Sequence, residues 1–147
     1  MKSFKITKVR ENAVIPKRGT KGSAGLDLCA CIDAPLTLNA GETAVIPTGV
    51  AIALPDENAA AFIFARSGLA VKHGIGLLNS VGVIDSDYRG ELCVGVINQI
   101  SEPYQIMPGE RIAQLVIMPV FPAEPVEVDS LDETERGTGG FGSTGRK

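Results

Sequence analysis

The sequence has no tryptophan, one histidine and only 5% aromatic residues among 147. Because 44% of the residues are nevertheless hydrophobic, we expect one domain whose core consists of Val, Ile, Leu and Ala. His73 cannot complete a zinc site, since Cys29 and Cys31 have a C-x-C spacing and Cys93 is isolated. We expect Cys29 and Cys31 to be small buried thiols in a protein of the reducing cytoplasm.

Long apolar runs are also missing. No run is long enough to span a bilayer, and the sequence shows no cleavable apolar segment at its start. The formal net charge of -3 disfavours a nucleic-acid polymer as a partner, because such binding draws on many uncompensated Lys and Arg residues. A single nucleotide is compatible with this charge, since it needs only a few cations and amides. We therefore expect neither a membrane nor a nucleic-acid polymer as a partner.

Short apolar segments separated by glycine and proline turns recur along the chain. This pattern predicts an all-β sandwich or barrel of the jelly-roll kind, with one short helix at residues 67–72. Strand edges and apolar faces of such a subunit need covering, so we expect association with copies of itself. The expected strands lie at residues 4–6, 26–32, 36–38, 43–46, 50–54, 62–64, 75–78, 81–84, 91–97 and 112–120.

The composition changes after Val120. Residues 129–135 are mostly acidic, and the RGTGGFGSTGRK stretch that follows has almost no apolar material. Burying so little apolar surface does not offset the entropy that is lost on ordering. We therefore predict a core at residues 1–125 and a mobile arm at residues 126–147.

The glycine-rich end of this arm allows two interpretations. It is either a linker end without function or a cover for a phosphate chain, since closely spaced glycine amides can converge on anionic oxygens. In the second case Ser143 and Thr144 would add hydroxyl donors, Phe141 would stack on a base and Arg136 would bring a positive charge. The segment lacks the residue order of a Walker loop.

The stretch GVIDSDYRGEL at residues 82–92 predicts a strand, a tight polar loop and a second strand. Asp85 ends the apolar run, where partial burial would tune its carboxylate as a base. Tyr88 would offer a flat face to a ring. An ordinary hairpin with a solvated acidic tip is the alternative.

A second polar cluster follows the apolar segment that ends at Ala65. Arg66 brings a cation, and Ser67 and Gly68 open a helical turn whose free amides suit a phosphate. A plain Ser N-cap beside a surface arginine is an equally good interpretation.

Three further polar residues stand among apolar neighbours. Asp27 lies within an apolar strand, where an acid is either paired, close to a metal, or on an edge that faces water. Gln114 and Asn79 carry amides that need partners from the backbone or from a ligand.

In this order, the polar clusters resemble the five motifs of the trimeric dUTPases, the deoxyuridine triphosphate nucleotidohydrolases. The motifs are AGLDL (24–28), ARSGLA (65–70), GVIDSDYRGEL (82–92), GERIAQL (109–115) and RGTGGFGSTG (136–145). The resemblance runs from near Ser23 to the C-terminus. It implies a jelly-roll-like (β-clip) subunit, and a homotrimer with three active sites between subunits. It also implies Mg²⁺-assisted hydrolysis of dUTP to dUMP and pyrophosphate, which keeps uracil out of DNA and supplies dUMP for dTMP synthesis.

The resemblance also implies roles for residues of the central loop. Asp85 would be the base that activates water and would contact the sugar 3′-OH. Tyr88 would pack beneath the deoxyribose and leave no room for a 2′-OH. Asn79 would recognise uracil together with backbone groups of the hairpin at Val83 and Ile84.

The remaining roles concern the triphosphate. Asp27 would hold Mg²⁺ through water. The residues that would bind the phosphates are Arg66, Ser67, Gly68 and Gln114. From the arm, Arg136 and Phe141 would cover the nucleotide, and the γ-phosphate would be capped by Gly142, Ser143 and Thr144.

Two other functions are alternatives to dUTP hydrolysis. The dCTP deaminases share the fold but need an acid–base residue at the cytosine ring, whereas the loop at residues 85–90 resembles the hydrolase version. A non-catalytic trimer that binds nucleotide or a protein would have no need of a water-activating base such as Asp85.

Overall fold

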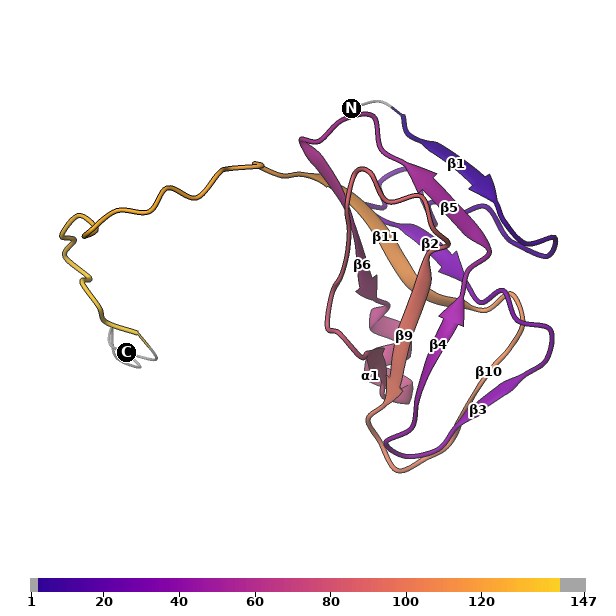
Figure 1. Ribbon diagram of the computed structural model, residues 1–147. Helices are drawn as coiled ribbons and strands as arrows, with labels where there is room; N and C mark the ends of the chain where they lie inside the picture. Colours follow the sequence, from indigo (N-terminus) through magenta and orange to yellow (C-terminus); the bar gives the residue numbers. More distant parts are fainter. Residues whose placement is uncertain (1–2, 141–147) are drawn as a thin grey trace.

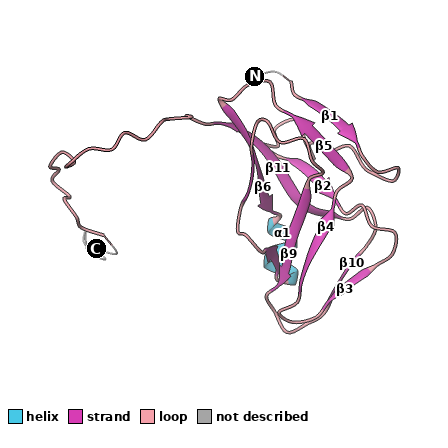
Figure 2. Cartoon of the chain, viewed as in Figure 1, coloured by secondary structure: helices cyan, strands magenta, loops and turns pink. Residues whose placement is uncertain are grey.

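The computed structural model describes residues 3–140, which form short β-strands and one helix (Figures 1 and 2). In chain order the elements are β1 (Lys5–Lys8), β2 (Leu26–Cys29), β3 (Leu36–Leu38), β4 (Thr43–Pro47), β5 (Val50–Ala53), β6 (Ala59–Ala65), α1 (Ser67–His73), β7 (Ile75–Leu77), β8 (Gly82–Ile84), β9 (Cys93–Asn98), β10 (Tyr104–Ile106) and β11 (Arg111–Pro119). The predicted mostly β, jelly-roll-like chain with one short helix is therefore confirmed. Among the described residues no helix is long and apolar enough to cross a membrane.

Strands that are distant in sequence pair with one another. The largest sheet of the described chain has the order β2-β11-β6-β8, a second has the order β4-β9-β7, and β1 pairs with β5 and β3 with β10. All these pairings are antiparallel. The long strand β11 holds β2 on one side and β6 on the other. It therefore joins the motif that contains Asp27 to the end of the strand that precedes Arg66.

The core is aliphatic, as the composition predicted. The largest fully buried side chains are Leu28, Ile46, Leu92, Ile106, Ile112, Leu115, Val50, Val94, Val96, Asn98 and Thr48. The two polar members have partners. Asn98 Nδ2 donates to the carbonyl oxygens of Leu38 and Glu102 at 3.0 and 2.8 Å, and Thr48 Oγ1 donates to the Leu92 carbonyl at 2.6 Å. These bonds remove the cost of burying an amide and a hydroxyl.

Helix α1 corrects one sequence-based interpretation. Arg66 occupies the N-cap position and Ser67 is already helical, so Ser67 is not the N-cap, and no side chain caps the helix start. The helix ends at Gly74, whose φ of 66° lies in the left-handed region. A Cβ atom on Gly74 would also lie 2.6 Å from Cγ2 of Ile100. Glycine is needed there for both reasons.

Strand β10 was not expected, because no strand was predicted between residues 97 and 112. Instead Tyr104 pairs with Leu38 of β3, and its hydroxyl donates to Oε1 of Glu110. Burial, with a contribution from that hydrogen bond, raises the pKa of Tyr104 to about 12. Its ring lies 4.8 Å from the His73 ring, centroid to centroid. The pairing joins segments far apart in sequence, which a local pattern does not reveal.

The chain leaves the body of the protein after β11. The Val120 amide donates to the Asn58 carbonyl at 2.9 Å, and the residues that follow extend away from the sheets (Figure 1). Large apolar side chains on this segment are exposed, among them Phe121 at 95% and Leu131 at 87%. The described part of the segment has neither helix nor strand.

Candidate active site

A cleft of about 260 Å³ opens at the end of β6. Its lining residues are Gly19, Ser23, Gly25, Asp27, Arg66, Ser67, Gly68, Arg111 and Gln114. Four of these were predicted to bind phosphates and one, Asp27, to hold a metal through water. The fold therefore brings these five predicted residues together from β2, the start of α1 and β11.

Asp27 is the charged centre of the cleft. Its Oδ1 lies 3.1 Å from Nε of Arg66, and its Oδ2 lies 3.1 Å from Nη1 of Arg111. Arg66 Nη1 also donates to the carbonyl oxygen of Arg111 at 2.9 Å. An acid in an apolar strand was expected to be paired, close to a metal, or on an edge that faces water. The structure shows Asp27 paired with two arginines. Two cations facing one carboxylate leave a net positive charge in the cleft.

Gln114 lies beside this ion-pair group on β11. Its Nε2 donates to the Ala65 carbonyl at 3.0 Å, so the backbone supplies the partner that its amide needs. A Cβ atom on Gly25 would lie 3.0 Å from Gln114 Oε1 and 3.2 Å from Gln114 Cβ. The glycine therefore allows the close approach of β11 that brings Gln114 into the cleft.

Sequence reasoning missed two polar contributors to the cleft. Arg111 stands in the fourth motif and pairs with Cys29 across the sheet, three residues before Gln114. Ser23 belongs to the loop before β2, where its Oγ lies 3.0 Å from both the backbone nitrogen and Oγ1 of Thr20. Strict alternation along β11 would place Arg111 on the face of Ala113 and Leu115, which are buried. The β-bulge or irregularity between Arg111 and Ala113 breaks this alternation, and the long-range pairing with β2 brings Arg111 to Asp27.

The loop that carries Asp85 follows β8. The Tyr88 amide donates to the Asp85 carbonyl at 3.2 Å, which closes a turn. Arg89 Nη1 donates to the carbonyl oxygens of Ser86 and Tyr88 at 2.7 and 2.9 Å. The expected strand, tight loop and strand are thus present, but Asp85 is exposed in the single chain. The expectation that it is partly buried is wrong for the isolated subunit.

Glu91 anchors the end of this loop. Arg10 donates to its two carboxylate oxygens, with Nε–Oε1 at 2.6 Å and Nη2–Oε2 at 3.0 Å. The Gly49 amide donates to Oε1 at 2.8 Å. The hydrogen bond from Arg10 is the largest cause that lowers the pKa of Glu91 below its ordinary value. No feature of the sequence connects Arg10 to the loop, because the two lie 81 positions apart.

The other predicted contacts of the nucleoside lie near this loop. Asn79 is exposed before β8, and Val83 and Ile84 form the strand itself, with Val83 60% exposed. Asn79 and Asp85 therefore flank β8. Arg136 is far along the C-terminal segment, where its Nε donates to the Gly139 carbonyl at 3.1 Å. The predicted contacts Phe141, Gly142, Ser143 and Thr144 lie outside the described residues.

The cleft and the Asp85 loop lie at opposite ends of β6. Strand β8 pairs antiparallel with β6, so that Ile84 faces Ala61, whereas Arg66 follows the other end of β6 at Ala65. From Ala61 to Arg66 a strand covers about 16 Å at ~3.3 Å per residue. Asp85 is accordingly absent from the lining of the cleft. One chain brings the phosphate-type residues together but holds Asp85 apart from them.

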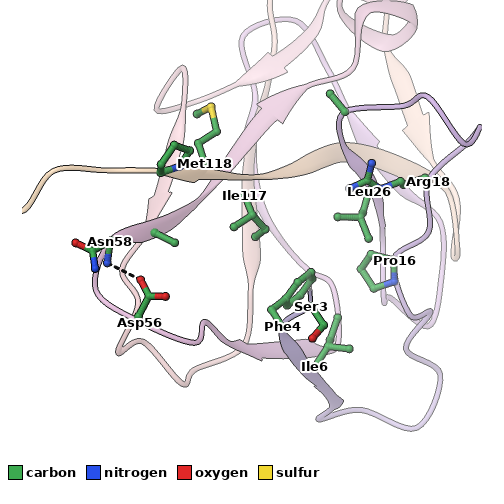
Figure 3. A pocket seen from close by; sticks show the side chains of 13 residues that line it. Ser3, Phe4, Ile6, Pro16, Arg18, Leu26, Asp56, Asn58, Ile117 and Met118 are labelled. Atoms are coloured by element: carbon green, nitrogen blue, oxygen red, sulfur yellow. Dashed lines mark hydrogen bonds between the residues drawn. The ribbon is translucent and has the colours of Figure 1, made fainter. Parts of the chain in front are cut away.

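A larger hollow lies elsewhere, between β1 and the β2–β11 edge of the large sheet. It measures about 800 Å³, and Phe4, Ile6 and Ile117 line it (Figure 3). None of the predicted site residues is among its lining residues. Its size does not make it the active site, because charge on a triphosphate requires converging cations and hydrogen-bond donors.

Comparison with known proteins identifies the family. The sequence model of the dUTPase family matches residues 11–145. A deoxyuridine 5'-triphosphate nucleotidohydrolase from Desulfitobacterium hafniense is 56% identical over 143 residues, which cover 96% of this chain and 95% of the relative. The chain belongs to the dUTPase family. A dUTPase relative from Burkholderia multivorans is likewise 56% identical over 143 residues, 97% of each chain.

Solved dUTPase structures share the fold. The dUTPase of Staphylococcus bacteriophage 80alpha with dUPNHPP has a TM-score of 0.89 at 30% identity, covering 99% of each chain. A mutant dUTPase from phage phi11 of S. aureus has a TM-score of 0.79 at 27% identity, covering 89% of this chain and 99% of the other. That structure is described as showing the coordination of a structural Mg(II) ion. The resemblance inferred from the five motifs is thereby confirmed.

Proposed function

We propose that this chain hydrolyses dUTP to dUMP and pyrophosphate in active sites that are shared between copies of the chain in a homotrimer. Membership of the dUTPase family makes the chain a dUTP diphosphatase. The observation that carries the shared site is the separation of Asp85 from the Arg66 cleft along β6. A base must lie within hydrogen-bond reach of the water that attacks phosphorus, so one chain cannot supply both halves.

The cleft is the phosphate half of this site. The cleft is lined by Arg66, Arg111 and the Gln114 amide, and Asp27 is the one acidic residue in the described part of its lining. A triphosphate brings more negative charge than one carboxylate, and it can take over the guanidinium of Arg66 in a charge-assisted contact. The amides and hydroxyl at Ser67 and Gly68 then face the same anion. Developing charge on the phosphates is stabilised by groups already held in place.

Mg²⁺ fits this half only together with the nucleotide. The described residues contain no cluster of three or more His, Cys, Asp or Glu side chains that would hold a metal by themselves. Both oxygens of Asp27 are engaged by arginines, which suits a contact through water rather than direct coordination. When bound to the phosphates, Mg²⁺ neutralises charge and polarises the phosphoryl oxygens.

The loop after β8 is the nucleoside half. Asp85 orients the attacking water toward the α-phosphorus and accepts its proton. The sugar 3′-OH contacts the same carboxylate. Tyr88 lies beneath the deoxyribose, and Asn79 recognises uracil with the backbone of Val83 and Ile84. Exposure of these groups in the single chain supports the proposal, because a second copy's cleft has to approach them.

The C-terminal segment covers the nucleotide in this proposal. We assign residues 1–125 to the core and residues 126–147 to an arm, with Arg136 and residues 141–144 at the nucleotide. From Pro119 to Arg136 an extended chain reaches about 56 Å, which is enough to arrive at a site on another copy. Closure excludes bulk water from the reacting triphosphate. A homotrimer would thus use parts of several copies at each site.

We propose a cytoplasmic location for the enzyme, and its cysteines support this. Cys29, Cys31 and Cys93 are all free, and Cys93 is exposed. Free thiols persist in reducing compartments, which supports a cytoplasmic location.

Substrate assays test the activity. Pyrophosphate release with Mg²⁺ should be fast for dUTP and slow for dTTP, UTP and dCTP. Ammonia release from dCTP would instead identify a deaminase, and binding without turnover would identify a non-catalytic nucleotide-binding trimer.

Mixing two inactive variants tests the shared site. Arg66→Met removes the phosphate half and Asp85→Asn removes the base, so each variant alone should be nearly inactive. Co-refolded in equal amounts, they should recover about one quarter of the wild-type rate, since random assembly reunites two intact halves at that frequency. Absence of any recovery in verified mixed oligomers would place both halves in one chain and contradict the proposal.

A further inference from the structure

Tyr88 folds back over the glycine that follows it by two positions. A Cβ atom on Gly90 would lie only 2.5 Å from Cζ of the Tyr88 ring and would collide with its hydroxyl oxygen as well. The φ angle of Gly90 lies outside the left-handed region, so its backbone does not require glycine. Glycine at position 90 is therefore needed to leave room for the ring of Tyr88, and not to form the turn.

The hydroxyl of Tyr88 has a fixed acceptor. It donates to the carbonyl oxygen of Glu91 at 3.1 Å. Glu91 is held through its side chain by the guanidinium of Arg10 and the amide of Gly49. The peptide whose carbonyl accepts the hydrogen bond from the Tyr88 hydroxyl is therefore in a part of the chain that other contacts hold in place.

Leu92, the next residue, also holds this peptide in place. Leu92 is fully buried, and its amide donates to the Val50 carbonyl at 2.8 Å. Its carbonyl accepts hydrogen bonds from the amide and the hydroxyl of Thr48, at 3.1 and 2.6 Å. Gly90 and Glu91 therefore form a rigid support, whereas the Tyr88 side chain above it remains 43% exposed.

We infer that Gly90 is a positioning residue that sets the preference of the enzyme for deoxyribose over ribose. This inference rests on the proposed function, in which the Tyr88 ring lies beneath the sugar. The ring reaches its position only because nothing projects from Gly90, and the bond to the Glu91 carbonyl keeps it there. A methyl group at position 90 pushes the ring off its support. The space that the ring occupied then becomes available to a 2′-OH.

The variant Gly90→Ala tests this inference through substrate preference. Because the colliding atoms are the far end of an exposed side chain, the ring can swing away and the protein should fold with a nearly unchanged melting temperature. The ratio of kcat/KM for dUTP to kcat/KM for UTP should fall by about tenfold or more, the size of discrimination that close packing against a substrate supplies. A general structural defect would lower both values and leave their ratio in place.

Two further variants complete the test. In Gly22→Ala the new Cβ meets no atom within 4 Å, so this control should keep the wild-type ratio. Tyr88→Phe keeps the ring but removes the bond to Glu91, and it should lower the ratio less than Gly90→Ala does. If Gly90→Ala does not fold, Tyr88→Phe still tests whether the held position of the Tyr88 ring sets the preference for dUTP over UTP.

The possible failures differ from one another. If the wild type prefers dUTP and folded Gly90→Ala keeps that preference, the inference is overturned while the proposed function stands. The same holds if Gly90→Ala does not fold and Tyr88→Phe keeps the preference. If the wild type does not hydrolyse dUTP, or accepts UTP equally well, the proposed role of Tyr88 fails and the inference falls with it.

Discussion

The guanidinium of Arg10 binds the carboxylate of Glu91 through two parallel hydrogen bonds, with Nε–Oε1 at 2.6 Å and Nη2–Oε2 at 3.0 Å. Such two-pronged contacts are geometrically specific, and the Gly49 amide adds a third donor to the same carboxylate. The N-terminal segment is thereby tied to the end of the loop that carries Asp85.

This pair predicts how stability changes with pH. The pKa of Glu91 in the folded protein lies below the ordinary value of 4.5, chiefly because of the hydrogen bond from Arg10. Its stabilising contribution is therefore complete above pH 4.5 and is lost as the pH falls through the folded-state pKa. The difference in unfolding free energy between wild type and Glu91→Gln, measured in urea, should shrink as the pH is lowered from neutral to below 4.5.

A variant of the partner provides the control for this measurement. In an Arg10→Met background the carboxylate has lost its strongest donor, so the effect of Glu91→Gln should depend much less on pH. An equally large pH dependence in that background would show that Arg10 does not cause it.

Gly49 predicts a local loss of stability. Its φ of 71° is left-handed, and a Cβ atom there would lie 2.5 Å from Cβ of Ala13 and 2.8 Å from Sγ of Cys31. Gly49→Ala should destabilise the fold by about 2 to 4 kcal/mol, which combines the left-handed backbone with overpacking. Gly41→Ala is the matched control, because Gly41 has a φ of 73° but open space around it. Equal losses in urea unfolding would remove the packing part of this explanation.

The strands were predictable from the sequence where the pattern is local. Alternating apolar residues between glycine and proline turns located β3 and β4, and the absence of tryptophan correctly indicated an aliphatic core. Strand β10 was missed because it is defined by its pairing with β3, which lies far away in the sequence. The strand after the Asp85 loop begins at Cys93 and not at Glu91. It pairs with β4 and β7, whereas β8 pairs with β6, so the two strands flank the loop without forming the expected hairpin.

The candidate site was predictable as a set of residues but not as an arrangement. Asp27 and Gln114 stood out because a polar group in an apolar strand needs a partner. That the partners of Asp27 are Arg66 and Arg111 depends on β11 lying next to both β2 and β6. The distance of Asp85 from this group depends on the register of β8, which no local pattern contains.

The charged cleft predicts an effect of removing its acid. Asp27→Asn leaves Arg66 and Arg111 without a carboxylate, so inorganic pyrophosphate should bind more tightly in the absence of Mg²⁺. The same variant should hydrolyse dUTP more slowly with Mg²⁺, because the outer contact to the metal-bound water is lost. Calorimetric titration and steady-state rates measure the two effects. Weaker binding of pyrophosphate would show that Asp27 orders the arginines more than it competes for them.

The C-terminal arm predicts a separation of activity from folding. Deleting residues 136–147 should strongly reduce turnover while the melting temperature and the oligomeric state stay unchanged, since the chain has already left the sheets at Val120. Removing only Arg146 and Lys147, outside the 136–145 motif, should have little effect. Normal hydrolysis of dUTP by the longer deletion would refute the covering role of the arm.

Asp85 predicts a loss of chemistry without a loss of binding. Asp85→Asn keeps the shape and the hydrogen-bonding ability of the side chain but cannot accept the proton of water. The rate kcat should therefore fall by about 10² to 10⁴-fold, the range that a positioned general base contributes. Affinity for a non-hydrolysable dUTP analogue should change little, because the cleft of Arg66 and Gln114 binds the phosphates. Asp87→Asn, two residues along the same exposed loop, should remain close to wild type. If both variants lost activity equally, the negative charge of the loop, and not a base at position 85, would drive the reaction.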